Sequence, residues 1–187
     1  PDGKVVVLGN FTAYNGVAKK QLIRINNDGS LDTTFDSGTG FSISSAFYLN
    51  SLSLQPDGKM IVGGNFSAYN GSATNGLVRL NSDGSMDSGF NIGSGFKKSY
   101  NGPFGVGFTP GTVNATLLQS DGKIIVAGEY DRFNGTTLVN ILRLNPDGTL
   151  DTSFKDSIGG TYYSSNTGLS GLGFISYLHE MANHKIL

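Results

Sequence analysis

The hydrophobic residues of this chain occur in short runs that are separated by polar turns. The clearest run is residues 60–64, Met-Ile-Val-Gly-Gly, whose continuous and partly β-branched character predicts a buried strand. Asp57-Gly58 and Asp83-Gly84 predict tight hairpins, because glycine tolerates the positive φ that such turns require. Three further strands are predicted at residues 52–55, 76–80 and 86–90. Together these segments predict one antiparallel meander of four short strands, with a polar loop at residues 67–75.

The same pattern occurs three times along the chain. Pro-Asp-Gly-Lys at Pro1 returns at Pro56, and Ser-Asp-Gly-Lys follows at Ser120. Each copy continues with an Ile/Val-rich run, Tyr-Asn-Gly or Phe-Asn-Gly, Arg-Ile-Asn or Arg-Leu-Asn, and a second Asp-Gly turn. Repetition at such a period is typical of arrays in which each repeat is one structural unit.

The repeats divide the chain at about residues 1–55, 56–119 and 120–181. Residues 173–187 are compatible with a short amphipathic helix, but they also align with the segment around Pro56. On that alignment residues 182–187 are the degenerate start of a fourth repeat. Both ends of the chain then lie inside repeats, so we expect an excerpt of a larger ring, or a ring completed by other subunits.

A lone four-stranded sheet cannot cover both of its faces, so the repeats are expected to stack on one another. Radial stacking gives a β-propeller and protects most strand edges, whereas linear stacking gives a solenoid. Repeats of about 60 residues with four strands favour the propeller, because β-helix coils are much shorter. The predicted fold class is therefore all-β, with antiparallel four-stranded propeller blades.

The repeat also resembles a known family. The series Gln-Pro-Asp-Gly-Lys, Gly-Gly-Asn-Phe, Tyr-Asn-Gly, Arg-Leu-Asn and Asp-Gly-Ser, best seen in residues 55–90, is similar to the delta-60 repeats of predicted β-propellers. The resemblance implies a part of a large bacterial surface or secreted protein, or of a phage particle. It implies no catalytic residues.

Charge and composition exclude several classes of function. The formal net charge is -1, from 13 basic and 14 acidic residues, which argues against binding to nucleic acid or to an anionic membrane surface. The chain has no cysteine, so disulfides and thiolate metal sites are excluded. No apolar run approaches the roughly 20 residues of a membrane-spanning helix. We expect no cofactor and no insertion into a membrane.

Motifs that suggest a metal site or an enzyme fit poorly. An EF-hand loop centred on Gly29 would place Arg24 and Phe35 where carboxylates are needed. A looser calcium site at Asp28 and Asp32 is left open, although Asx turns account for the same residues. The two histidines near the C-terminus are five positions apart and would not share a helix face. No metal site is therefore predicted.

The repeats differ mainly in the crossovers after each fourth strand, and these are the predicted binding elements. Residues 96–111 and 157–170 are insertions rich in aromatic residues, and the third repeat carries an unusual Glu-Tyr-Asp-Arg-Phe segment. We expect the Asp-Gly hairpins at one end of each blade, and the Tyr-Asn-Gly loops and crossovers at the other. The candidate binding residues are Tyr100, Phe104, Phe108, Glu129, Asp131, Arg132, Tyr162 and Tyr163. The alternative is that the aromatic residues only pack between blades.

Other repeated residues are predicted to be structural. Phe35, Phe90 and Phe154 are assigned to the core. The repeated arginines are expected to pair with aspartates or with backbone carbonyls between blades; they are Arg24, Arg79 and Arg143.

The sequence thus predicts a non-enzymatic structural or binding module of an extracellular surface, appendage or phage-particle protein. Its partner would be a protein or a glycan, bound through the long loop face. Two alternatives remain: a glycan hydrolase or lyase that uses Glu129, Asp131 and Arg132, and a purely structural subunit that self-associates into an oligomer or filament.

Overall fold

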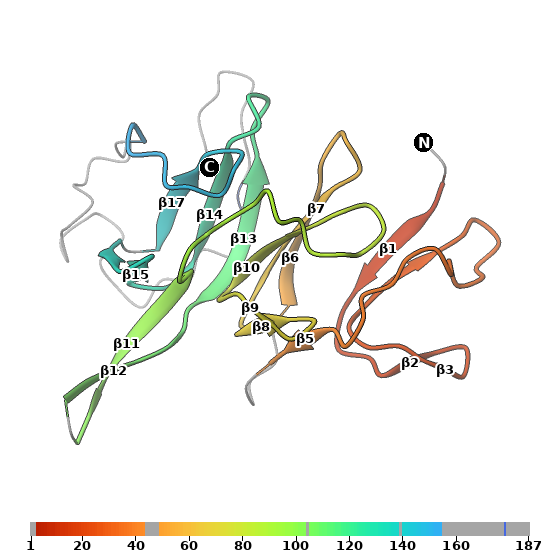
Figure 1. Ribbon diagram of the computed structural model, residues 1–187, viewed down its shortest axis with the longest axis horizontal. Coiled ribbons are helices and arrows are strands. Elements are labelled where there is room, and N and C mark those ends of the chain that lie inside the picture. The colour runs from red at the N-terminus through yellow and green to blue at the C-terminus, as the bar shows by residue number, and fades with distance from the viewer. Residues whose placement is uncertain (1–2, 44–48, 104, 139, 155–177, 179–187) are drawn as a thin grey trace.

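The protein is seen in a computed structural model that describes residues 3–43, 49–103, 105–138, 140–154 and 178. These residues form antiparallel sheets and include no helix. No helix long and apolar enough to cross a membrane is therefore found among them. Figure 1 shows the main sheets of the three repeats side by side in chain order. Within the described residues these sheets do not close into a ring.

Each repeat contributes one main sheet. The second repeat pairs β6 (Leu49–Leu54), β7 (Met60–Gly64) and β10 (Leu77–Leu80), with β7 in the centre and buried throughout. The third repeats this order with β13 (Thr112–Leu118), β14 (Ile124–Glu129) and β17 (Ile141–Leu144). The first has β1 (Val5–Leu8) and β4 (Leu22–Ile25). The antiparallel all-β class predicted from the sequence is confirmed.

The predicted fourth strand is much shorter than expected. At residues 86–90 it is reduced to a single bridge between Met86 and Leu80, and the other repeats have the matching bridges Ile25–Leu31 and Leu144–Leu150. The Asp87 N–H still bonds the Arg79 carbonyl, but the Phe90 N–H then turns back to the Asp87 carbonyl. The chain leaves the sheet at this point because Asp87 directs its side chain into a buried ion pair.

The predicted polar loop at residues 67–75 contains a small hairpin, β8 (Ala68–Tyr69) with β9 (Ser72–Ala73). The first and third repeats have equivalent pairs, β2 (Ala13–Tyr14) with β3 (Val17–Ala18) and β15 (Arg132–Phe133) with β16 (Thr136–Thr137). The turn between β8 and β9 has positive φ at both Asn70 (45°) and Gly71 (78°), as a primed hairpin turn requires.

This hairpin corrects the predicted separation of two loop faces. The Tyr69 hydroxyl donates a 2.6 Å hydrogen bond to the carbonyl of Gly84, which belongs to the second Asp-Gly turn of the same repeat. Tyr14 and Gly29 repeat the contact at 2.7 Å. The Tyr-Asn-Gly loops therefore fold back over the blade and reach an Asp-Gly hairpin. They do not stand clear at the opposite end.

The crossovers pair with the small hairpins of the following repeat. β5 (Phe41–Ser42) pairs with β8, and β11 (Phe96–Gly102) pairs at its start with β15. β11 then continues into a ladder of six residue pairs with β12 (Gly105–Pro110), from Lys97↔Pro110 to Gly102↔Gly105. In Figure 1 this two-stranded ribbon projects away from the main sheets. We call β11 and β12 together the arm.

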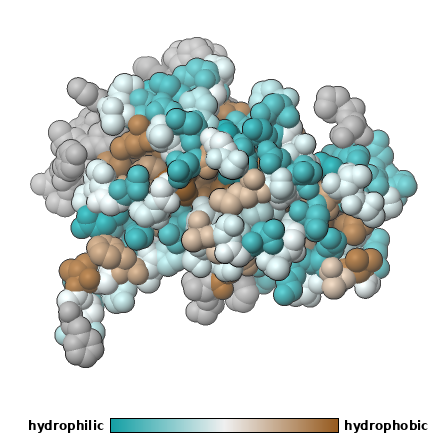
Figure 2. Space-filling model, in the orientation of Figure 1, coloured by the Kyte–Doolittle hydropathy of each residue, from teal (hydrophilic) through white to brown (hydrophobic). Residues whose placement is uncertain are grey.

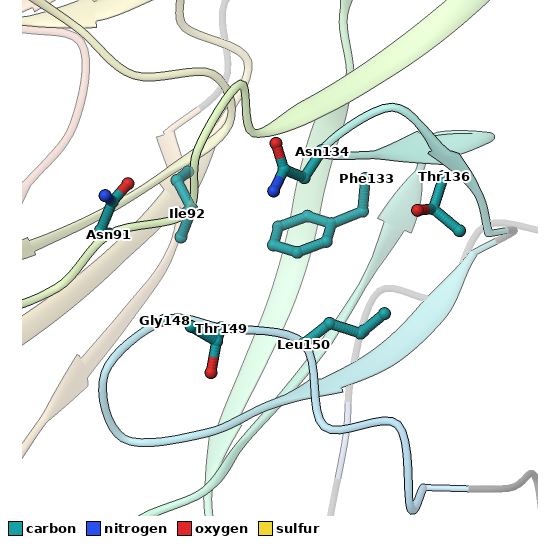
Figure 3. Close-up of a pocket in the computed structure, with 8 residues that line it drawn as sticks. All are labelled: Asn91, Ile92, Phe133, Asn134, Thr136, Gly148, Thr149 and Leu150. Carbon is teal, nitrogen blue, oxygen red and sulfur yellow. The ribbon is translucent and has the colours of Figure 1, made fainter.

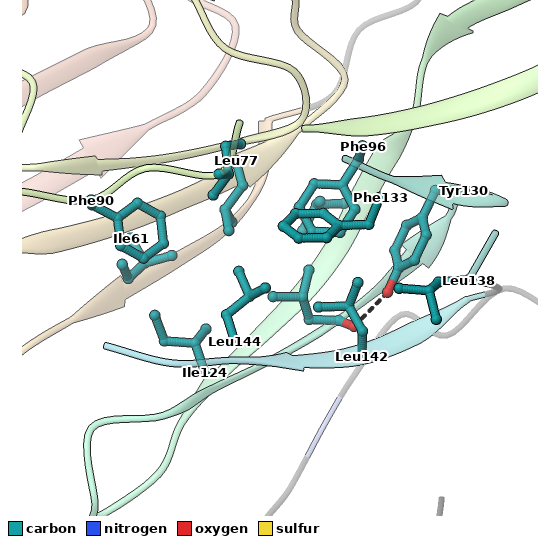
Figure 4. Close-up of a cluster of buried hydrophobic side chains, with 13 residues drawn as sticks. Ile61, Leu77, Phe90, Phe96, Ile124, Tyr130, Phe133, Leu138, Leu142 and Leu144 are labelled. Atoms are coloured by element: carbon teal, nitrogen blue, oxygen red, sulfur yellow. Dashed lines mark hydrogen bonds between the residues drawn. The ribbon is translucent and has the colours of Figure 1, made fainter. Parts of the chain in front are cut away.

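The hydrophobic core lies between repeats rather than within them. One cluster joins Leu22 and Phe35 of the first repeat to Val62 and Val78 of the second. The other joins Ile61 and Leu77 to the third repeat, where Tyr130 also donates a 2.7 Å hydrogen bond to the Val126 carbonyl (Figure 4). Phe35 and Phe90 are buried as predicted, whereas Phe154 is only half-buried and packs beside a smaller cluster that contains Leu178.

Polar contacts join the inner strands of neighbouring sheets. Asn50 and Asn114 lie at equivalent irregularities of β6 and β13, and the Asn50 amide donates to Asn114 Oδ1 at 3.0 Å. The hydroxyls of Ser51 and Ser53 both lie within hydrogen-bonding distance of Thr116 Oγ1, at 2.5 and 2.8 Å. Neighbouring blades are therefore fixed in register by hydrogen bonds as well as by apolar packing. The predicted fourth-repeat start at 182–187 lies outside the described residues.

Candidate functional site

The repeated charged residues form the same buried arrangement three times. In the second repeat Asp87 Oδ2 accepts hydrogen bonds from Arg79 Nε at 2.6 Å and Lys59 Nζ at 2.9 Å. The equivalent groups are Lys4, Arg24 and Asp32 in the first repeat, and Lys123, Arg143 and Asp151 in the third. Each aspartate is at most 8% exposed. Hydrogen bonds from the lysine, from the arginine and from the residue two positions after each aspartate outweigh burial, so the pKa of Asp32, Asp87 and Asp151 lies below its ordinary value.

Each arginine in this arrangement also contacts an aromatic ring. Arg24, Arg79 and Arg143 lie over Phe35, Phe90 and Phe154, with 4.8–5.1 Å between guanidinium carbon and ring centroid.

Two of these arginines reach into the next repeat. Arg79 Nη1 donates to the Pro146 carbonyl at 2.5 Å, and Arg24 Nη1 donates to the Ser82 carbonyl. The prediction that these arginines pair with aspartates or with carbonyls between blades is confirmed: all three pair with an aspartate, and Arg24 and Arg79 also reach a carbonyl. The repeated lysines were missed, although Lys follows each first Asp-Gly pair in the sequence.

In the second Asp-Gly turn of each repeat, the aspartate carboxylate accepts hydrogen bonds from the residue two positions further on. Asp28 Oδ1 accepts hydrogen bonds from the Ser30 N–H at 2.9 Å and from the Ser30 hydroxyl at 2.6 Å. Asp83 and Asp147 do the same with Ser85 and Thr149. These bonds lower the pKa of Asp28, Asp83 and Asp147. Within the described part of the chain, no group of three His, Asp or Glu residues is placed to hold a metal ion.

The arm carries the candidate binding residues that are most exposed. The predicted residues Tyr100 on β11 and Phe108 on β12 are 53% and 47% exposed, and Val106 on β12, which was not predicted, is 61% exposed. Figure 2 shows brown, apolar residues on the projecting ribbon. Tyr100 pairs with Gly107, and a Cβ at Gly107 would lie 2.4 Å from the Tyr100 ring. The glycine therefore lets the ring lie flat against the opposite strand.

The unusual segment of the third repeat supports the base of the arm. The Asp131 carboxylate accepts hydrogen bonds from the Ser99 N–H at 3.0 and 3.1 Å and from the Ser99 hydroxyl. The Arg132 guanidinium lies 5.2 Å from the Phe108 ring centroid and donates to Thr137 Oγ1 at 3.0 Å. Glu129 ends β14, where it pairs with Thr112.

The eight predicted binding residues are thus only partly brought together. Arg132 and Phe108 are in contact, and Asp131 lies beside β11, but these residues line no described cavity together with Glu129. Phe104, Tyr162 and Tyr163 lie outside the described residues. The resulting candidate surface is the arm with its base at Asp131 and Arg132.

A separate cavity lies beside Phe133, between the β15–β16 hairpin and the second Asp-Gly turn of the third repeat (Figure 3). Its inner wall is formed by Phe133 and Ile92, which are 2% and 6% exposed, together with the half-buried Leu150. Asn91 and Asn134 lie at its rim. This cavity was not predicted from the sequence. The one sequence feature that points to it is Phe133, which stands where the other two repeats have Tyr14 and Tyr69.

The family model described as "Domain of unknown function (DUF5122) beta-propeller" matches residues 1–35, 55–90 and 119–154. These segments make up more than half of the 187 residues. The chain belongs to this β-propeller family. Comparisons with curated proteins and with solved structures found no match.

The family match separates shared from particular features of this β-propeller chain. The three matched segments contain every residue of the Lys-Asp-Arg arrangements and all six Asp-Gly pairs. They do not contain residues 91–118, which include the whole arm and two residues of the cavity, Asn91 and Ile92. The arm is therefore an insertion between repeats of this family. The cavity lies where the third repeat has Phe133 in place of a tyrosine.

Proposed function

We propose that this β-propeller chain is a non-enzymatic structural and binding module of an extracellular-surface, appendage or phage-particle protein, and that its arm binds a protein partner. The delta-60 type of its repeats belongs to the same proposal. The observation that carries it is the arm itself, a two-stranded ribbon with exposed Tyr100, Val106 and Phe108.

The exposed ribbon of the arm is suited to gain a further strand from a partner. A two-stranded hairpin is at most marginally stable in water without a further strand or a covering surface. β12 is the outer strand of its sheet, so one of its edges has no neighbouring strand among the described residues. An extended segment of a partner can add to such an edge through backbone hydrogen bonds, while side-chain contacts give specificity. Lys97 and Lys98 on β11, the strand next to β12, favour a partner segment with acidic side chains.

The positions of the acidic residues support a non-enzymatic role. Asp131 is engaged by Ser99, and the repeated aspartates are held in ion pairs that join elements of the scaffold. A glycosidase needs two carboxyl groups at a defined separation across one cleft. Asp131 instead holds the base of the arm, and Glu129 lies at the end of a strand, which favours positioning over catalysis.

The test places a photoreactive residue on the arm. The full-length protein that contains this chain is made in its natural host with p-benzoylphenylalanine at Phe108. Val17, 48% exposed on the small β2–β3 hairpin, is substituted in the same way as the matched control. Illumination is expected to give one discrete adduct with a second protein from position 108 and none from position 17.

The adduct also separates this proposal from its alternatives. An adduct between two copies of the same protein would support the filament subunit instead. Absence of any adduct from position 108, with the protein folded and assembled, would contradict binding of a protein through the arm.

A further inference from the structure

The third repeat lacks a hydroxyl that the other two repeats use to join two turns. Tyr69 and Tyr14 donate hydrogen bonds to the carbonyls of Gly84 and Gly29, at 2.6 and 2.7 Å. Phe133 stands at the equivalent position, and Phe133 and Gly148 both line the cavity (Figure 3). A phenyl ring has no donor, so in the described structure the Gly148 carbonyl lacks the hydrogen bond made in the other repeats.

The cavity beside this position can hold a small ligand. The cavity has a volume of about 130 Å³. An apolar cavity of roughly 150 Å³ is large enough to bind benzene, so a single six-membered ring is the appropriate size of ligand. The cavity is open to solvent on the side of Asn91 and Asn134, both of which are exposed, so a larger molecule can insert one ring and continue outward.

The chemistry of the lining selects a neutral ligand with hydroxyl groups. None of the residues that line the cavity carries an ionisable side chain. Asn91 Oδ1 accepts from the Gly93 N–H, and Asn134 Oδ1 accepts from the Ser94 N–H, so each amide is held with its NH₂ group still available. Within the described residues no hydrogen bond is formed by either NH₂ group. A hydroxyl that donates to Gly148 and others that accept from the amides would satisfy all three groups.

We infer that this cavity binds one neutral saccharide unit, with a sugar hydroxyl replacing the missing tyrosine hydroxyl at Gly148. A saccharide combines hydroxyls that both donate and accept with an apolar ring face, and Phe133, Ile92 and Leu150 provide an apolar wall for that face. The cavity shares no residue with the arm. The site therefore goes beyond the proposed binding of a protein, and each can fail without the other.

The test titrates the isotope-labelled chain with glucose, galactose, mannose and N-acetylglucosamine, and follows the backbone amide signals by NMR. At least one of these probes is expected to shift signals around Phe133 and Gly148 in a saturable manner. The variant Phe133→Tyr supplies the hydroxyl that Tyr69 has, placed to donate to the Gly148 carbonyl as Tyr69 donates to Gly84. It is expected to weaken binding of that probe by about tenfold or more, because a competing hydrogen bond is formed inside the protein.

Two controls keep the outcome clear. Tyr100→Ser alters the arm and leaves the cavity unchanged, so it should bind the saccharide as the original chain does. Melting of Phe133→Tyr at or above the original temperature shows that lost binding does not reflect unfolding. Absence of a saturable shift with all four probes overturns the inference, as does unchanged affinity in Phe133→Tyr.

Discussion

Arg79 and Asp87 form an ion pair of 2.6 Å in which both side chains are only 10% exposed. The same Asp87 oxygen accepts the ammonium of Lys59, and the same guanidinium reaches the Pro146 carbonyl of the next repeat. One carboxylate thus links two strands of its own blade to the neighbouring blade. The repeated acidic residues are accounted for by this structural role.

Replacement of Asp87 by Asn should be strongly destabilising. It removes the negative charge but leaves Arg79 buried, and breaking such a pair costs about 3 kcal/mol of unfolding free energy. The matched control is Asp36→Asn, because Asp36 is 74% exposed and pairs with Lys19 at 3.3 Å. The control should change the unfolding free energy by about 0.5 kcal/mol or less. Urea denaturation measures both, and equal effects would count against the structural role of Asp87.

The same carboxylates predict a loss of stability in acid. Burial alone would raise the pKa of Asp87, but Lys59, the Gly89 N–H and Arg79 outweigh it and lower the pKa from 3.8 to about 2. Because the folded pKa lies below the unfolded one, the stabilisation is complete above about pH 4 and is lost as the pH falls towards 2. The free energy of unfolding, measured across this range, should fall less steeply in Asp87→Asn. A value that does not change between neutral pH and pH of about 2 would refute this account.

The buried tyrosine hydroxyl should contribute measurably to stability. Burial and the nearby Asp36 and Asp83 carboxylates raise the pKa of Tyr69, so its hydroxyl stays protonated as a donor to Gly84. Tyr69→Phe should cost about 1 kcal/mol, because the Gly84 carbonyl loses its partner inside the protein. Tyr14→Phe removes the same bond at an exposed position and should cost less. Thermal melts compare the two, and a larger loss in Tyr14→Phe would contradict this explanation.

A side chain of the Asn-Gly turn also links repeats. Asn70 Oδ1 accepts a 3.1 Å hydrogen bond from the Thr39 N–H of the preceding crossover. Asn70→Gly keeps the positive φ but removes this bond. The control is Asn15→Gly, which makes the same backbone change at a position where the described residues show no such bond. Asn70→Gly should be less stable than Asn15→Gly by about 0.5–1 kcal/mol in denaturant titrations. Identical values would show that the bond contributes nothing.

Much of the scaffold could be predicted because its signals are local and repeated. Gly58 and Gly84 adopt the positive φ that their Asp-Gly turns indicated. The run at residues 60–64 is the buried central strand β7, and Arg24 pairs with Asp32 as expected. Agreement among three copies made these predictions reliable, since each residue type recurs at the same place.

The hairpin at residues 68–73, the short fourth strand and the cavity were missed, the last two because they depend on contacts between residues far apart in the sequence. The Asn70-Gly71 pair is a hairpin signal inside a segment that was interpreted as a loop because of its polarity. Residues 86–90 were predicted to be a strand, yet the chain turns away after Asp87, whose carboxylate pairs with Lys59 and Arg79. The cavity beside Phe133 was missed because the contact of the equivalent Tyr69, with the carbonyl of Gly84, is seen only in the structure.

The most direct test of this account is the melting temperature of a chain with a shortened arm. Residues 100–107 are replaced by Asn-Gly, so that the paired Ser99 and Phe108 flank a two-residue turn and keep their contacts with Asp131 and Arg132. If the arm serves binding and not folding, the melting temperature should change by less than about 2 °C. A fall of many degrees, or loss of the cooperative transition, would show that the arm is part of the scaffold and contradict its role as a binding element.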